Sequence, residues 1–138
     1  MQELVADARA HGAKIEAGGE VLRNEGYFSS PTIITGVNEG ARIVDEEQFG
    51  PALPIMSFKT IDEVIHRANN THFGLGGSIW TNDLQRGAEL ALELESGTGW
   101  VNQHLNLAPN VPFGGSKWSG IEYENDHGGW LRSANCMW

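Results

Sequence analysis

The chain has a single cysteine, Cys136, among its 138 residues. One cysteine excludes an internal disulfide and any metal site built from several thiolates. Cys136 follows Ser-Ala-Asn near the end of the sequence, with no neighbouring base and no helix start to favour its thiolate. The end of a chain is also a poor platform for positioned chemistry. We therefore reject Cys136 as a nucleophile and expect no catalytic residue in this chain.

Basic residues are also scarce, with nine Lys and Arg against eighteen Asp and Glu and a net charge of −9. Binding to nucleic acid or to an anionic membrane surface needs clustered positive charge, so neither partner is expected. No apolar run reaches the length of a membrane span, and the N-terminus lacks the basic and apolar regions of a leader. The sequence therefore predicts a soluble, cytoplasmic protein.

Metal-ligand spacing is absent as well. The five histidines are His11, His66, His72, His104 and His127. Their spacing is not that of metal ligands, so we expect no metal.

The composition that remains is that of a folded domain. Forty per cent of the residues are hydrophobic and five are tryptophan, which is not the composition of a disordered tail. Short apolar runs alternate with helical periods, a pattern typical of βα units. We predict an α/β fold with three layers, a mainly parallel sheet flanked by helices. With no repeat and no linker, residues 1–138 are expected to form one domain.

The first half of the chain gives several local predictions. Residues 3–10 have the period of a helix, residues 14–17 and 52–58 read as strands, and residues 27–34 as extended chain. Thr60-Ile61-Asp62-Glu63 has the form of a capping box, which predicts the start of a helix. The apolar face of that helix consists of Ile61, Val64, Ile65 and Ala68.

The second half continues the same alternation. Residues 76–81 and 98–102 are predicted strands, and a Gly/Pro/Asn-rich loop follows through residue 119. Asn82 is the expected N-cap of a second helix that Gly97 ends. The apolar face of this helix is predicted to consist of Leu84, Ala88, Ala91 and Leu92.

Glu47 and Phe49 are the first candidates for a binding role. A carboxylate accepts hydrogen bonds from two vicinal hydroxyls, such as those of a ribose, and a nearby aromatic ring restricts a flat heterocycle. The alternative is a solvated acidic turn, since Asp45, Glu46 and Glu47 are consecutive.

Phe113 and Lys117 are candidates in the late glycine-rich loop. Phe113 precedes Gly114-Gly115, and it either lines a pocket or anchors a structural turn. Lys117 either attracts an anion or is solvated. His104 follows Trp100-Val101-Asn102 and either overhangs a pocket or lies on the surface.

Several ordered stretches resemble the motifs of one family. They are Gly12-Ala13-Lys14 with Gly18-Gly19, Gly26-Tyr27-Phe28 with Pro31-Thr32, Glu46-Glu47-Gln48-Phe49-Gly50-Pro51, Ala68-Asn69-Asn70-Thr71 with Phe73-Gly74-Leu75, Gly97-Thr98-Gly99-Trp100-Val101-Asn102, and Pro112-Phe113-Gly114-Gly115-Ser116-Lys117-Trp118-Ser119-Gly120. Together they resemble the C-terminal part of the catalytic domain of the NAD(P)-dependent aldehyde dehydrogenases. The resemblance runs from about residue 1 to residue 131.

The resemblance implies roles for four residues. Glu47 would hold the hydroxyls of the nicotinamide ribose, and Phe49 would lie beside the nicotinamide. Leu107 and Phe113 would line the aldehyde channel. The complete enzyme would use NAD or NADP to oxidise an aldehyde to a carboxylic acid through a covalent intermediate on a cysteine.

The sequence also departs from the family pattern. The resemblance places the nucleophilic cysteine, the general-base glutamate, the oxyanion asparagine and the dinucleotide-binding domain before the equivalent of Met1. Glu122-Tyr123 replaces the usual residues after Gly120-Ile121, and residues 133–138 replace a strand used in subunit association. We therefore expect a fragment that does not turn over and binds no cofactor alone.

Two alternatives stay open. The chain could be a stand-alone binding or assembly module, with self-association through exposed apolar faces and strand edges. Trp118, Trp130 and Trp138 would suit such a surface. The other alternative is a two-chain enzyme completed by an upstream aldehyde dehydrogenase polypeptide.

Overall fold

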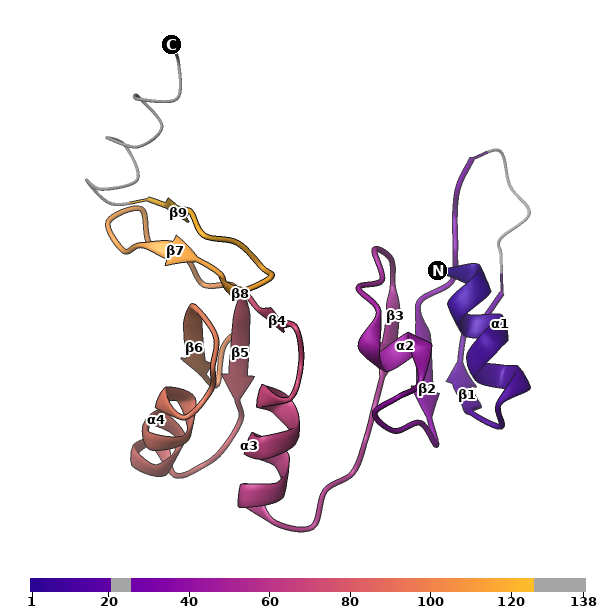
Figure 1. Ribbon diagram of the computed structural model, residues 1–138, viewed down its shortest axis with the longest axis horizontal. Helices are drawn as coiled ribbons and strands as arrows, with labels where there is room; N and C mark the ends of the chain where they lie inside the picture. The colour runs from indigo at the N-terminus through magenta and orange to yellow at the C-terminus, as the bar shows by residue number, and fades with distance from the viewer. Residues whose placement is uncertain (21–25, 126–138) are drawn as a thin grey trace. The chain divides into compact units, whose positions relative to one another are not determined.

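A computed structural model describes residues 1–20 and 26–125 (Figure 1). The chain divides into two compact units, Met1–Phe58 and Lys59–Trp138. Each unit is considered by itself below. The expected single domain over residues 1–138 stays a prediction, and the tail at 133–138 lies outside the described residues.

The first unit packs helix α1 on a three-stranded sheet. Its elements are α1 (Gln2–Ala10), β1 (Lys14–Ala17), β2 (Thr32–Thr35), α2 (Arg42–Asp45) and β3 (Ala52–Pro54). Strand β2 is central, antiparallel to β1 and parallel to β3. The predicted helix at 3–10 and strand at 14–17 are confirmed.

The core of this unit follows from simple periodicity. Leu4, Val5 and Ala8 fall on one face of α1 and are buried, as a helical period requires. They pack in one cluster with Ile34 and Ile43, both of which are fully buried.

Strands β2 and β3 are shorter than the extended segments predicted from the sequence. The strand predicted at 52–58 ends at Pro54, and the Ile55 N–H makes one further bond, to the Ile34 carbonyl at 2.8 Å. In the extended segment predicted at 27–34, the regular strand begins only at Thr32, whose N–H donates to the Pro51 carbonyl at 2.7 Å.

The second unit has a parallel strand pair joined by a helix. Its elements are α3 (Ile61–Asn69), β4 (Phe73–Gly74), β5 (Gly76–Ile79), α4 (Leu84–Leu92), β6 (Thr98–Val101), β7 (Phe113–Gly114), β8 (Ser116–Lys117) and β9 (Tyr123–Glu124). Strands β5 and β6 are parallel, and α4 makes the crossover between them, as a βαβ unit demands. Short antiparallel pairs join β4 with β8 and β7 with β9.

The caps of the two helices agree in part with the sequence. Thr60 caps α3 as predicted, its hydroxyl accepting from the Glu63 N–H at 3.2 Å. The Glu63 carboxylate accepts in turn from the Lys59 N–H at 3.0 Å. The predicted cap of α4 is wrong by one residue, because Asp83 and not Asn82 accepts from the Arg86 N–H.

The predictions for the end and the buried face of α4 were wrong. The helix ends at Leu92, well before Gly97. Gly87 and Leu90 are buried, whereas Leu84 is 65% and Leu92 is 87% exposed. A Cβ on Gly87 would lie only 2.8 Å from the Thr81 methyl and 2.9 Å from a Val101 methyl. The helix therefore packs on its smallest residue, which a search for apolar side chains overlooks.

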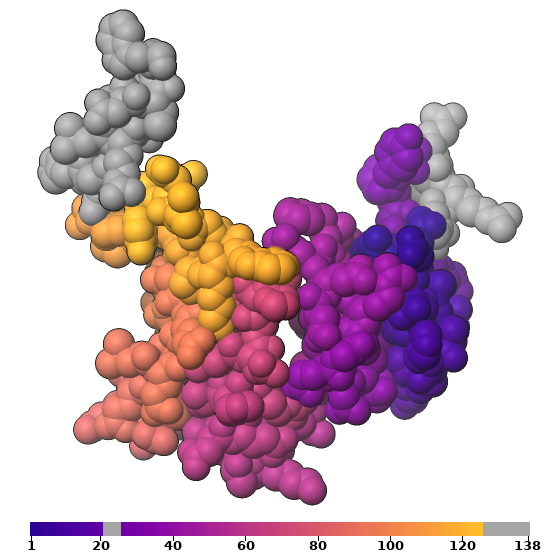
Figure 2. Space-filling model, in the orientation of Figure 1, coloured from indigo at the N-terminus to yellow at the C-terminus, as the bar shows by residue number. Residues whose placement is uncertain are grey.

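Apolar surface is consequently left exposed on the second unit. Helix α3 has no buried residue, and its apolar residues Val64 and Ile65 are only half-buried. The α4 segment, salmon in the figures, lies at the surface in the space-filling view (Figure 2). Within the described part of this unit, both helices thus keep an apolar stripe in contact with solvent.

Candidate functional site

Glu47 and Phe49 lie in the loop between α2 and β3. Both side chains are exposed, and Phe49 is 88% accessible. Gln48, between them, is half-buried and donates to the Ala52 carbonyl at 3.1 Å. The loop therefore anchors its middle residue and presents the two candidate residues outward.

The two acidic residues before Glu47 already have partners. Asp45 accepts from the Gly40 N–H at 2.9 Å. Glu46 pairs with Arg42 at 2.6 Å, and hydrogen bonding from Arg42 lowers the pKa of Glu46. The same contacts, first with Glu46 and then with Glu3, raise the pKa of Arg42. Glu47 has no hydrogen bond or ion pair with another residue in ranges 1–20 and 26–125, so its carboxylate is available to a ligand.

Leu107 and Phe113 belong to the second unit, and each is linked to Trp100 in a different way. The Trp100 side chain is buried, at 4% exposure, and its ring centroid lies 6.4 Å from that of Phe113. The Trp100 indole Nε1–H donates to the carbonyl of Asn106, the residue before Leu107, at 3.0 Å. Leu107 itself is 44% exposed and Phe113 is half-buried. One buried tryptophan thus positions both predicted pocket residues.

His104 lies in the same loop and is held on two sides. Its Nδ1 and the Ser78 hydroxyl share a hydrogen bond of 2.7 Å. Its ring meets the Trp100 ring edge-on at 5.3 Å between centroids. His104 therefore lies at the surface, but it also has fixed contacts with Ser78 and Trp100.

Lys117 is part of the scaffold. Its Nζ lies 2.8 Å from a Glu95 carboxylate oxygen and also donates to the main-chain carbonyl of Asn69. Asn69 is the last residue of α3, where a helix has unpaired carbonyls and favours a cation. The lysine is thus neither solvated nor free for an anion, because it closes the end of α3.

Sequence reasoning missed the structural part played by Asn69. Its Nδ2 donates to the Glu93 carbonyl at 2.8 Å, and its Oδ1 accepts from the Glu95 N–H at 2.8 Å. Glu95 also receives the Ser116 hydroxyl on its main-chain carbonyl, at 2.8 Å. The sequence feature that could have revealed this role is an asparagine at a helix end, where the side chain often hydrogen-bonds to neighbouring backbone groups. Residues from different motifs of this unit are therefore joined by hydrogen bonds.

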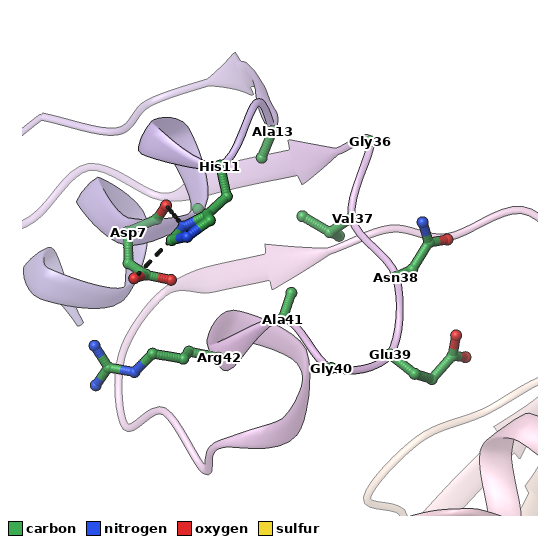
Figure 3. Close-up of a pocket in the computed structure, with 11 residues that line it drawn as sticks. Asp7, His11, Ala13, Gly36, Val37, Asn38, Glu39, Gly40, Ala41 and Arg42 are labelled. Atoms are coloured by element: carbon green, nitrogen blue, oxygen red, sulfur yellow. Dashed lines mark hydrogen bonds and ion pairs between the residues drawn. The ribbon is translucent and has the colours of Figure 1, made fainter.

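A pocket of about 420 Å³ lies in the first unit, between the end of α1 and the loop at 36–42 (Figure 3). His11 turns toward Asp7, with Nδ1–H donating to the Asp7 carbonyl at 2.9 Å. Arg42 is on the rim. The residues lining the pocket include none of the four predicted site residues, so sequence reasoning does not connect this pocket with the cofactor or the substrate.

Three further observations concern the described residues only. Ranges 1–20 and 26–125 contain no group of three His, Cys, Asp or Glu side chains placed to hold a metal. No helix in these ranges is both long and apolar enough to cross a membrane. Cys136, Trp130 and Trp138 lie outside the described residues, whereas Trp118 is exposed and stacks on His72 at 4.3 Å.

Comparison with known proteins adds the identity of the fold. The model of the aldehyde dehydrogenase family matches residues 1–138. Cytosolic aldehyde dehydrogenase 1 of Rattus norvegicus is 47% identical over 118 residues, which are 86% of this chain and 24% of that protein. Retinaldehyde dehydrogenase 3 of Homo sapiens is 45% identical over the same share of this chain and 23% of its own length.

Solved structures agree with the sequence relatives. Betaine aldehyde dehydrogenase from Staphylococcus aureus, in complex with NAD⁺, has a TM-score of 0.89 and 34% identity over 95% of this chain and 27% of that one. The NAD⁺ complex of an aldehyde dehydrogenase from Bacillus cereus has a TM-score of 0.87 and 39% identity over 93% of this chain and 27% of its own. The predicted α/β fold class is therefore confirmed.

Fold and motifs together define an α/β protein that resembles the solved aldehyde dehydrogenases over most of its length. The chain belongs to the aldehyde dehydrogenase family. It spans about a quarter of the length of the curated relatives that it matches, 24% for the rat protein.

Proposed function

We propose that this chain is the C-terminal segment of the catalytic domain of an NAD(P)-dependent aldehyde dehydrogenase, which in its complete form oxidises an aldehyde to a carboxylic acid. The observation that carries the proposal is Glu47. Of three consecutive acidic residues, Asp45 and Glu46 have partners in the unit, and Glu47 has none among the described residues. The Glu47 carboxylate is therefore available to accept hydrogen bonds from a ligand.

Glu47 and Phe49 are the residues proposed to bind the cofactor. The free carboxylate of Glu47 would accept hydrogen bonds from the two ribose hydroxyls. The Phe49 ring is exposed to solvent. Exposing so large an apolar group costs free energy unless a ligand covers it. The solved relatives from Staphylococcus aureus and Bacillus cereus are NAD⁺ complexes, which supports NAD as the cofactor.

Leu107 and Phe113 form the aldehyde side. Both are partly exposed apolar side chains; the Phe113 ring lies beside the buried Trp100, and Leu107 follows Asn106, whose carbonyl accepts the Trp100 indole N–H. Such a rigid apolar wall suits a small uncharged substrate. NAD(P)⁺ would supply hydride acceptance when bound, and the residues of this chain would only orient the cofactor and enclose the aldehyde.

We further propose that the 138 residues alone do not turn over. Covalent aldehyde oxidation needs a positioned thiolate and a base, and the only cysteine in this sequence is Cys136. Neither would the chain hold NAD(P) firmly, since Glu47 and Phe49 supply only one edge of a cofactor site.

The apolar stripes on α3 and α4 favour a partner. In the complete enzyme the remaining polypeptide would cover them, and in isolation a second copy would do so. Leu84 and Leu92 on α4 are the residues that carry this second, assembly-type candidate. A cytosolic location is proposed from the rat relative, which is named for that compartment.

The test is an assay of NADH formation with a panel of aldehydes, run on the 138-residue chain and on the complete polypeptide that contains it. Turnover by the complete polypeptide and none by the chain alone supports the proposal. Sustained turnover by the chain alone, retained after Cys136→Ser, would contradict the claim that the chain alone is inactive.

A further inference from the structure

We infer that His104 and Ser78 form a positioning pair that sets the place of the aldehyde-binding loop. The inference rests on the proposed function, because it assigns a specificity-determining role to residues that do not themselves meet the substrate. His104 is a positioning residue, and Leu107 and Phe113 are the residues that it positions.

The loop at 102–112 begins in an unusual backbone conformation. Asn102 and Leu105 have φ values of 54° and 53°, in the left-handed region that residues other than glycine rarely adopt. His104 lies between them. Backbone in this conformation persists only where surrounding contacts fix it.

Five hydrogen bonds provide that fixation. The Asn102 carboxamide bonds both the N–H and the carbonyl of Thr81, each at 2.8 Å. Asn106 bonds the Gln103 side chain at 2.8 Å and receives the Trp100 indole N–H on its carbonyl. Among these contacts the Ser78–His104 bond, at 2.7 Å, is the one that ties the middle of the turn to strand β5.

The His104 ring also supports Trp100 directly. The two rings meet edge-on at 5.3 Å, and Trp100 in turn contacts Phe113 and holds the carbonyl before Leu107. Loss of the Ser78–His104 bond should therefore displace both pocket residues together. A displaced apolar wall weakens aldehyde binding and leaves Glu47 and Phe49, which belong to the first unit, unchanged.

Two pairs of variants separate the hydrogen bond from simple packing. His104→Phe keeps a ring against Trp100 and removes the bond, whereas His104→Asn keeps a polar atom near the position of Nδ1. Ser78→Ala removes the hydroxyl and Ser78→Thr retains it. His66→Asn, at an exposed histidine on α3, is the matched control.

The first measurement needs no activity. Hydrogen exchange of the Trp100 indole proton, followed by NMR on the 138-residue chain and assigned with Trp100→Phe, reports on the bond to Asn106. We expect exchange to be about two- to tenfold faster in His104→Phe and Ser78→Ala, the range that one net hydrogen bond allows. His104→Asn, Ser78→Thr and His66→Asn should match the unchanged chain. Equal exchange in all six proteins would overturn the inference.

The second measurement is kinetic, in the complete polypeptide. The KM for the aldehyde should rise about two- to tenfold in His104→Phe and Ser78→Ala, with kcat and the KM for NAD⁺ within about twofold. Rescue by His104→Asn and Ser78→Thr is expected. An unchanged aldehyde KM despite faster indole exchange would overturn the specificity role.

The two arms also separate this inference from the function it rests on. If no variant and no unchanged protein oxidises any aldehyde, the proposed function fails while the exchange data still decide the pair. If aldehydes are oxidised and kcat falls while the KM for the aldehyde rises, His104 acts on the reaction itself, and the positioning role is wrong.

Discussion

The carboxamide of Asn102 clamps the backbone of Thr81, accepting from its N–H and donating to its carbonyl at 2.8 Å each. This pair joins the end of β6 to the end of β5, at the point where the loop at 102–112 begins. The last residue of the Gly97–Asn102 stretch therefore has a structural purpose that does not depend on any ligand.

Replacing Asn102 tests this clamp. Asn102→Ala should lower the free energy of unfolding by about 1–3 kcal/mol, because two hydrogen bonds are lost and alanine tolerates the left-handed backbone poorly. Urea unfolding measures it, with the exposed Asn110→Ala as control. Equal midpoints for the two variants would contradict the clamp.

Gly97 should tolerate no side chain. A Cβ there would run directly into the main-chain oxygen of Gly114, so Gly97→Ala should cost about 3 kcal/mol or more. Gly12→Ala is the control, since Gly12 has a φ of 89° and open space around it, and only the backbone cost of about 1–2 kcal/mol is expected. A similar loss in both, by thermal or urea unfolding, would show that the contact with Gly114 is unimportant.

Glu63 should make stability depend on pH. Its pKa is lowered from 4.5, first by the hydrogen bond from the Lys59 N–H, against a smaller opposing effect of burial, and then by Arg67. A group with a lower pKa in the folded state stabilises that state above its unfolded pKa. The stabilisation is therefore present at neutral pH and is lost as the pH falls below 4.5 toward the folded value.

The measurement is the difference in urea midpoint between the unchanged chain and Glu63→Gln across this range. We expect the unchanged chain to be more stable at neutral pH and the difference to shrink as the solution is acidified. A difference that stays constant with pH would rule out the carboxylate as its source. Glu122→Gln, at an exposed site, serves as the control.

The exposed stripe of α4 should drive self-association. Sedimentation velocity on the 138-residue chain at micromolar concentration should show a species larger than a monomer. Leu84→Gln combined with Leu92→Gln should shift it toward monomer without loss of stability, because both side chains are already exposed. Gln85→Ala on the same helix is the control. A monomeric unchanged chain would contradict the prediction.

Glu47 should matter for the cofactor. In the complete polypeptide, Glu47→Gln should weaken NAD⁺ binding by about tenfold, because a charged acceptor for two hydroxyls becomes neutral. Calorimetric titration measures the affinity, and Glu122→Gln again serves as control. Identical affinities for Glu47→Gln and the unchanged enzyme would remove Glu47 from the site.

Local structure was predictable where one side chain decides it. Thr60 starts α3 because its hydroxyl reaches the free N–H of Glu63, and the spacing of Leu4, Val5 and Ala8 identifies the buried face of α1. The buried face of α4 was not predictable in this way, since Gly87 is buried for its lack of a side chain. The cap at Asp83 was missed because the neighbouring Asn82 is an equally good capping residue.

The site was predictable only in its parts. The sequence placed Glu47 beside Phe49, but it did not show which of the three acidic residues would pair with the nearby Gly40 and Arg42, because that depends on the backbone conformation around α2. Trp100, which supports the loop of Leu107 and contacts Phe113, acts through a bond to a backbone carbonyl, and sequence patterns do not reveal such bonds. The roles of Glu47, Phe49, Leu107 and Phe113 toward cofactor and aldehyde remain predictions.

The most direct test of the central claim is the size of the protein in the source cells, detected with an antibody against residues 26–125. Because the chain has a mass of 15.0 kDa and spans 24% of the rat relative, our account predicts a band at about four times that mass. A single band at 15 kDa would contradict the account and would favour a stand-alone module or a two-chain enzyme.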